Sequence, residues 1–189
     1  MTAILIAEPA TEPVNISELK DYLRIETADE DALIAELLKY ARIYLENTSG
    51  LKLITQIWRI YLDKIVAGIP VELPLSPIRS VQSVTAYDED GTPSTIEPSK
   101  YSTDLLSSVP KILFHNSLPA TRCFNGVEID VNAGFGDLAT DVPDSLRRAI
   151  IILAAHWYEF RSEFSPQQQP VSIPDGFTTL LAPYRRIMI

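Results

Sequence analysis

The hydrophobic period changes twice along this chain, and that change limits the folds it can adopt. Apolar residues recur at helical spacing in residues 15–48, alternate one by one in the middle of the chain, and return to helical spacing in residues 144–160. A spacing near 3.6 residues indicates an amphipathic helix, whereas alternation indicates a strand with a buried side. The chain is therefore expected to be an α+β protein in which a β-rich segment interrupts a set of helices.

Two helices are predicted in the N-terminal third of the chain. Asn15 and Glu18 form a capping-box pattern, in which each side chain satisfies a backbone N–H at the start of a helix, and this predicts a helix at about 16–24. A second helix is predicted at about 29–48, because its first turn is acidic and Gly50 is suited to end it. Each helix has one apolar face and is expected to bury it in a core.

Short strands are predicted for the middle of the chain. Residues 54–62 alternate between two faces, and Pro74 and Pro77 suit edges or bends of a sheet better than central positions. A turn is predicted at Asp88–Gly91. The further strands are expected at 71–75, 81–87, 101–104, 112–114 and 127–131. Together these strands are expected to form a small antiparallel sheet or a barrel-like insert.

A third helix is predicted at about 143–161. Pro143 stands at its start, where the missing N–H of proline costs nothing. Apolar residues surround much of the helix between Ile150 and Ala155, so this helix is expected at the centre of the helical core. The fold class expected is α+β, with three main helices, a short C-terminal segment and an antiparallel β-rich insert.

The chain is expected to divide into four parts. Residues 1–14 show no hydrophobic period and are predicted to be an extended arm, whereas residues 15–52 and 133–164 are predicted to form the helical core. Residues 53–132 form the expected β-rich insert, and residues 165–189 form a linker followed by a docking segment. The linker is rich in glutamine and proline, a composition that favours reach over compactness.

The C-terminal segment contains the candidate partner-binding residues. Leu180, Leu181 and Tyr184 are apolar anchors in a tail too short to form its own core, and Arg185 and Arg186 are paired cations beside them. Such a tail usually docks, either on its own domain or on another chain. Because arginine and tyrosine are enriched at binding hot spots, we expect these residues to bind another subunit. The alternative is that the tail folds back on the helices of its own chain.

Arg147 and Arg148 are the clearest paired cations outside the C-terminal segment. They stand near the start of the third predicted helix, where the helix dipole disfavours positive charge. A carboxylate within the fold or on a neighbouring subunit would offset this effect. Two solvated arginines are the alternative.

Composition argues against several classes of protein. The net charge of −9 and a pI near 4.7 argue against DNA binding over a broad surface, which normally needs a basic stripe. No apolar run is long enough to cross a membrane, and the N-terminus lacks the pattern of a signal peptide, so a cytoplasmic protein is expected. The single cysteine, Cys123, leaves no intrachain disulfide and no multi-cysteine zinc site.

Catalytic and metal-binding motifs are not recognised in this chain. His156 and Glu159 lie one helical turn apart, but one such pair supplies only half of a coordination sphere. The Asp88–Gly91 sequence lacks the later ligands of a calcium loop, and the segment 134–136 lacks the remaining residues of a phosphate-binding loop. We therefore predict no catalytic residue, no cofactor, no metal and no enzymatic activity.

Taken in order, these segments resemble the phage head–tail connector (adaptor) family. The resemblance begins with Asn15–Arg24, the acidic residues Asp29–Asp31, and Tyr44–Gly50. The later segments that carry it are Leu53–Trp58, Leu73–Val84, Tyr87–Gly91, Ala133–Gly136, Val142–Pro143, Ala149–Glu159 and Leu180–Arg185. None of them carries chemistry, and their order along the chain is the specific signal.

The resemblance implies a structural protein of a long-tailed phage or of a phage-derived gene transfer agent. It implies a homo-oligomeric, dodecameric ring that joins the portal protein to a stopper or tail-completion protein. Double-stranded DNA would pass through the channel of this ring without sequence-specific binding, and an acidic channel wall would reduce sticking. The implied location is the neck of a virion or phage-like particle, after synthesis in the bacterial host cytoplasm and without a membrane.

Three alternatives stay open at this point. The chain could be another neck or tail-completion protein of the same particle, a small metal-dependent enzyme, or a monomeric binding module of a host pathway. Portal, protease and capsid genes beside its own gene would favour the particle. A thermal shift with divalent metals would favour the enzyme, because a specific ligand stabilises the folded state.

Overall fold

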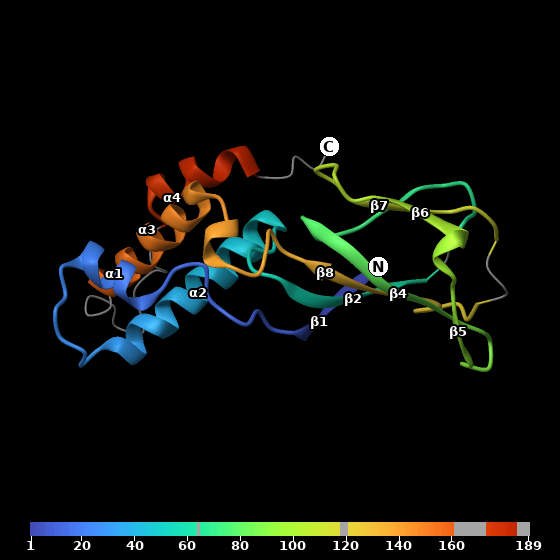
Figure 1. Ribbon diagram of the computed structural model, residues 1–189, viewed down its shortest axis with the longest axis horizontal. Helices are drawn as coiled ribbons and strands as arrows, with labels where there is room; N and C mark the ends of the chain where they lie inside the picture. Colours follow the sequence, from blue (N-terminus) through green and yellow to red (C-terminus); the bar gives the residue numbers. More distant parts are fainter. Residues whose placement is uncertain (64, 118–120, 161–172, 185–189) are drawn as a thin grey trace, which may run out of the picture. The chain divides into compact units, whose positions relative to one another are not determined.

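The change of hydrophobic period separates two structural units. The structure is a computed structural model that describes the chain except for residues 64, 118–120, 161–172 and 185–189. A β unit consists of Met1–Ala10 and Thr55–Phe135, and a helical unit consists of Thr11–Ile54 and the described residues of Gly136–Ile189. Figure 1 shows the elements of both units, and their mixture makes the chain an α+β protein, as expected.

The β unit contains two antiparallel sheets. The five-stranded sheet has the order β1-β2-β8-β4-β5, with strands Thr2–Ala7, Gln56–Leu62, Val127–Ala133, Ile78–Tyr87 and Pro93–Thr95. The three-stranded sheet has the order β3-β7-β6, with strands Val71–Glu72, Lys111–Phe114 and Tyr101–Asp104. A short 3₁₀ turn at Pro98–Lys100 precedes β6.

One hydrophobic core joins the two sheets of the β unit. The central strand β8 alternates strictly, and Val127, Ile129 and Val131 are fully buried. The same core contains Ile112 and Phe114 of β7, so the second sheet supplies the other side of the core. The alternation of apolar residues in the sequence therefore corresponds to burial of one face of each sheet.

The predicted extended arm of residues 1–14 is divided between the two units. Thr2–Ala7 forms strand β1, which pairs with β2 in antiparallel register and places Ile4 opposite Arg59. Residues 11–14 belong to the helical unit instead. The sequence gives no signal for β1, because Ala3 to Ala7 is a continuous apolar run without alternation.

The helical unit contains α1 (Ile16–Leu23), α2 (Asp31–Ser49), α3 (Asp144–Phe160) and α4 (Asp175–Leu181), with 3₁₀ turns at Ala139–Asp141 and Ala182–Tyr184. The predicted capping box starts α1, since the Asn15 side chain accepts from the Glu18 N–H and Glu18 accepts from the Asn15 N–H, each at 2.9 Å. Gly50 ends α2 in the left-handed conformation. The second helix begins at Asp31, later than predicted, and the carboxylate of Glu30 before it accepts a hydrogen bond from Tyr158.

Helix α3 lies at the centre of the helical unit and contacts the other three helices. Its residues Leu146, Ile150 and Leu153 are fully buried, on a helix that the sequence predicts to be apolar over much of its circumference. Helix α4 packs on α3 and buries Phe177. The described residues of this unit therefore form four helices, and α4 of the C-terminal segment packs on α3, whereas the sequence predicts a segment apart from the helical core.

Candidate assembly interface

The residues considered for chemistry do not form a reaction centre in the described parts of the chain. No group of three or more His, Cys, Asp or Glu side chains that could hold a metal occurs among these residues. The His156 ring packs against Phe160 with centroids 4.5 Å apart, while Glu159 is exposed. The Asp88 carboxylate accepts from the N–H groups of Asp90 and Thr92, so this acidic sequence caps a hairpin turn.

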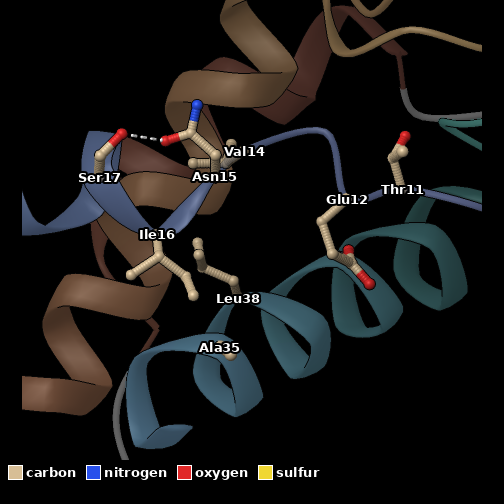
Figure 2. Close-up of a pocket in the computed structure, with 8 residues that line it drawn as sticks. All are labelled: Thr11, Glu12, Val14, Asn15, Ile16, Ser17, Ala35 and Leu38. Carbon is tan, nitrogen blue, oxygen red and sulfur yellow. Dashed lines mark hydrogen bonds between the residues drawn. The ribbon is translucent and has the colours of Figure 1, made fainter. Parts of the chain in front are cut away.

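A pocket of about 510 Å³ lies between the N-terminal segment of the helical unit and α2. Figure 2 shows the side chains of Ile16 and Leu38 directed toward each other within it. The lining residues are Thr11, Glu12, Val14, Asn15, Ile16, Ser17, Ala35 and Leu38. Among the side chains drawn in Figure 2, one hydrogen bond is marked: Ser17 Oγ donates to Asn15 Oδ1 at 2.6 Å. The pocket is suited to receive an apolar side chain, because its walls are mostly aliphatic.

The carboxylate of Glu12 at the rim of this pocket is held by a buried arginine. Arg42 of α2 donates to Glu12 through Nε at 2.7 Å and through Nη2 at 3.1 Å, while its own side chain is 4% exposed. Paired bonds of this kind fix both distance and orientation. The segment before α1 is therefore anchored to α2, and Glu12 is not an unpaired base in the pocket.

A second carboxylate continues this charge network into the core of the helical unit. Glu46 lies one turn after Arg42 on α2, at 3.4 Å from Arg42 Nη1 and 3.6 Å from Lys52 Nζ. It also accepts from the Leu53 N–H at 3.1 Å. Burial lowers the pKa of Lys52, and Glu46 opposes that change. Two cations and two carboxylates thus compensate one another inside the unit.

Arg147 anchors the same N-terminal segment to α3. Its Nε donates to the Pro13 carbonyl at 2.9 Å, its Nη2 binds the Glu18 carboxylate, and Asp144 lies 3.5 Å from Nη1. Arg148 stacks over the ring of Tyr22, with its guanidinium carbon 4.6 Å from the ring centroid. The carboxylate expected beside these arginines is therefore present within the fold.

The predicted partner-binding residues occupy different environments. Leu181 is fully buried in the helical unit, so it packs α4 rather than standing exposed as an anchor. Leu180 and Tyr184 are half-buried, and the Tyr184 hydroxyl lies 3.0 Å from Ser145 Oγ. Arg185 and Arg186 lie outside the described residues.

The network of Glu12, Arg42, Glu46 and Lys52 is not predicted from the sequence. One signal for it exists: Arg42 and Glu46 are an i, i+4 pair beside the apolar face of α2, and such pairs attract each other on a helix. The pairing with Glu12 has no such signal, because Glu12 lies 30 residues away in the chain.

No helix in the described parts of the chain is long and apolar enough to cross a membrane. The sequence model for the Phage gp6-like head-tail connector protein family matches residues 13–112, more than half of the chain. The chain belongs to this head–tail connector family, and its role is that of a structural connector.

Solved structures of particle necks resemble the whole chain. A chain from the neck of an empty GTA particle computed with C6 symmetry is 25% identical, with a TM-score of 0.82, over 100% of this chain and 97% of that one. A chain from the neck of a native GTA particle computed with C12 symmetry shares the fold, at 23% identity, a TM-score of 0.80 and the same coverage. Comparison with curated protein sequences gives no significant match.

Proposed function

We propose that this chain is a head–tail connector (adaptor) subunit that forms a ring between the portal and the stopper or tail. The observation that carries this proposal is the likeness to the neck chain of the GTA particle, which covers the full length of both units. A ring needs a heterologous contact that repeats from one copy to the next and closes. In this role the chain acts by binding its neighbours in the neck, without catalysis.

The negative net charge of the chain suits a ring through which DNA passes without binding. Each copy has a net charge of −9, so a ring of copies carries a large net negative charge. Several of its arginines are already paired, among them Arg42 with Glu12, Arg147 with Glu18 and Arg59 with Asp130. Paired cations contribute little attraction for phosphate, so double-stranded DNA would slide past the ring without sequence-specific binding.

Deletion of the gene in a particle-producing host tests the connector role. Heads are expected to accumulate without tails, and adding the purified chain is expected to restore tail attachment. Tailed particles at the normal yield without the chain would refute the role. A chain that joins only after the stopper is present would instead be another neck or tail-completion protein.

The C-terminal segment is our candidate for the contact with the portal. Leu180 and Tyr184 are partly exposed, and Arg185 and Arg186 follow them in the sequence. Leu181 supports this contact only indirectly, because its side chain holds α4 in the helical unit. An aromatic residue and two arginines beside an apolar anchor form the composition that hot spots favour.

Two substitutions on α4 test this contact without removing buried residues. Leu180→Asp places a charge at the partly exposed anchor, and Thr179→Asp places the same charge at its exposed neighbour. We expect both variants to fold, with only Leu180→Asp failing to co-sediment with portal-bearing heads. Normal binding by Leu180→Asp would show that this segment does not contact the portal.

A further inference from the structure

Strand β1 forms one edge of the five-stranded sheet. Its inner side pairs with β2, and none of the described strands pairs with its outer side. Figure 1 shows β1 beside β2 at this edge. An edge strand presents unpaired N–H and C=O groups, so it can accept an extended segment from another chain.

The side chains of β1 do not protect this edge. Ile4, Leu5 and Ile6 are consecutive and remain 41%, 40% and 50% exposed. Soluble proteins usually place charges or proline on an exposed edge, but Thr2–Ala7 contains neither. An irregularity in the pairing occurs only near Ile6, which leaves the register with β2 regular from Thr2 to Leu5.

The opposite edge of the same sheet differs in each of these respects. Strand β5 has only three residues, Pro93–Thr95, and begins with a proline that has no N–H to donate. Its side chains are exposed, and none of them is a large apolar residue. The sheet therefore has one short edge that disfavours pairing and one longer apolar edge that permits it.

The charge of the chain identifies the occupant that suits the β1 edge. Two copies of a chain with net charge −9 repel each other, and this repulsion is weaker where the contacting surfaces contain no acidic groups. Residues 1–7 contain no ionisable side chain, whereas acidic residues are frequent elsewhere in the chain. A basic partner would gain no charge attraction from this edge, whereas an acidic second copy meets no acidic side chain of residues 1–7 there.

We propose that the outer edge of β1 pairs with an extended segment of a second copy of this chain, as the contact between neighbouring subunits. This inference rests on the proposed ring and names one surface that would close it. The contact is heterologous, because an edge on one copy meets a different segment on the next, and such contacts generate rings. Main-chain hydrogen bonds would supply pairing, and the exposed apolar side chains would supply the buried area.

A photoreactive crosslinker at Leu5 identifies the occupant directly. The full chain carrying p-benzoylphenylalanine at this position is added to heads that lack the connector, irradiated and analysed by mass spectrometry. The expected product is a crosslink between two copies of this chain. A crosslink to a different neck protein, or no crosslink in heads that have bound the chain, overturns the proposal.

A matched pair of charge substitutions tests the energetic side of the contact. Ile4 is 41% exposed in the folded chain, so the Ile4→Glu carboxylate can reach solvent, and circular dichroism checks that the variant folds. Leu106→Glu adds the same charge at a fully exposed apolar residue of the same unit. Ile4→Glu is expected to weaken the apparent affinity for heads about tenfold, the effect of about 1.4 kcal/mol, and Leu106→Glu is expected to bind like the wild type.

The outcomes separate this inference from the connector role itself. Binding of Ile4→Glu at the wild-type level refutes the β1 contact but leaves the connector role intact. If the wild-type chain does not join heads, the connector role fails, and sedimentation of the purified chain decides the β1 contact. Concentration-dependent self-association that Ile4→Glu abolishes would then support it, and a wild-type chain that stays monomeric would overturn it.

Discussion

Glu12 and Arg42 are joined by two hydrogen bonds, at 2.7 and 3.1 Å, although 30 residues separate them in the chain. Arg42 is buried, and it also lies beside Glu46. This pair fastens the segment that precedes α1 onto α2. Arg42 and Arg147 therefore both hold the N-terminal boundary of the helical unit in place.

Arg42→Ala is expected to destabilise the chain by up to about 3–5 kcal/mol, because it removes the guanidinium that binds Glu12 and leaves the buried Glu46 to Lys52 and the Leu53 N–H. Chemical denaturation monitored by circular dichroism measures the change. Arg148→Ala is the matched control, since Arg148 is exposed and contacts the Tyr22 ring only from outside. An equal loss in both variants would contradict a special role for the buried network.

Gly136→Ala is expected to lower the free energy of unfolding by about 0.5–1.5 kcal/mol, the net contribution of one intramolecular hydrogen bond. A Cβ at Gly136 would lie 2.1 Å from Asp141 Oδ2, the atom that accepts the Leu138 N–H at 2.9 Å. The carboxylate would have to move and release that bond. Gly68→Ala is the control, because a Cβ added at Gly68 would have no atom within 4 Å. It measures the effect of replacing a glycine without a close approach, together with the strain of the positive φ at Gly68. A Gly136→Ala variant as stable as wild type would show that Asp141 moves without cost.

Leu153→Ala is expected to cost about 2–5 kcal/mol, as large-to-small changes in a core do. Leu153 is fully buried on α3, the helix that contacts the other three helices of its unit. Tyr40→Ala, at a position 58% exposed on α2, is expected to change stability by less than about 0.5 kcal/mol. The shift in denaturant midpoint of each variant measures the difference.

Phe177→Ala is expected to destabilise the helical unit by about 3–5 kcal/mol. The Phe177 ring is buried and lies 5.8 Å from the ring of Tyr44, so its removal leaves a cavity between α4 and α2. For the same reason, removal of residues 176–189 is expected to weaken the fold as well as any contact with a partner. A Phe177→Ala chain with an unchanged melting temperature would show that α4 contributes no stability.

The boundaries of the helices are largely predictable from the sequence. The capping box at Asn15 and Glu18 starts α1, and Gly50 ends α2. Both signals act through residues within one turn of each other, so they are visible without knowledge of the tertiary structure. The apolar circumference of α3 likewise predicts its central position.

Strand β1 and the packing of helix α4 are not predictable from such local signals. Strand β1 exists because β2, more than fifty residues later, supplies its pairing partner. Helix α4 is short, and it is held by rings and aliphatic side chains from α2 and α3. An isolated helix of this length is unstable in water, so its sequence alone predicts little about where it packs.

By itself, the sequence determined the α+β class, the three longer helices, the alternation of the β unit and the order of segments that places the chain among head–tail connectors. These properties depend on periodicity and on capping residues, which are local. Only the tertiary structure decided that Glu12 binds Arg42, that Arg147 binds Glu18, and that Ile4 lies on an unpaired edge. Each of these depends on which distant segments the core brings together, and side-chain periodicity contains no information about that choice.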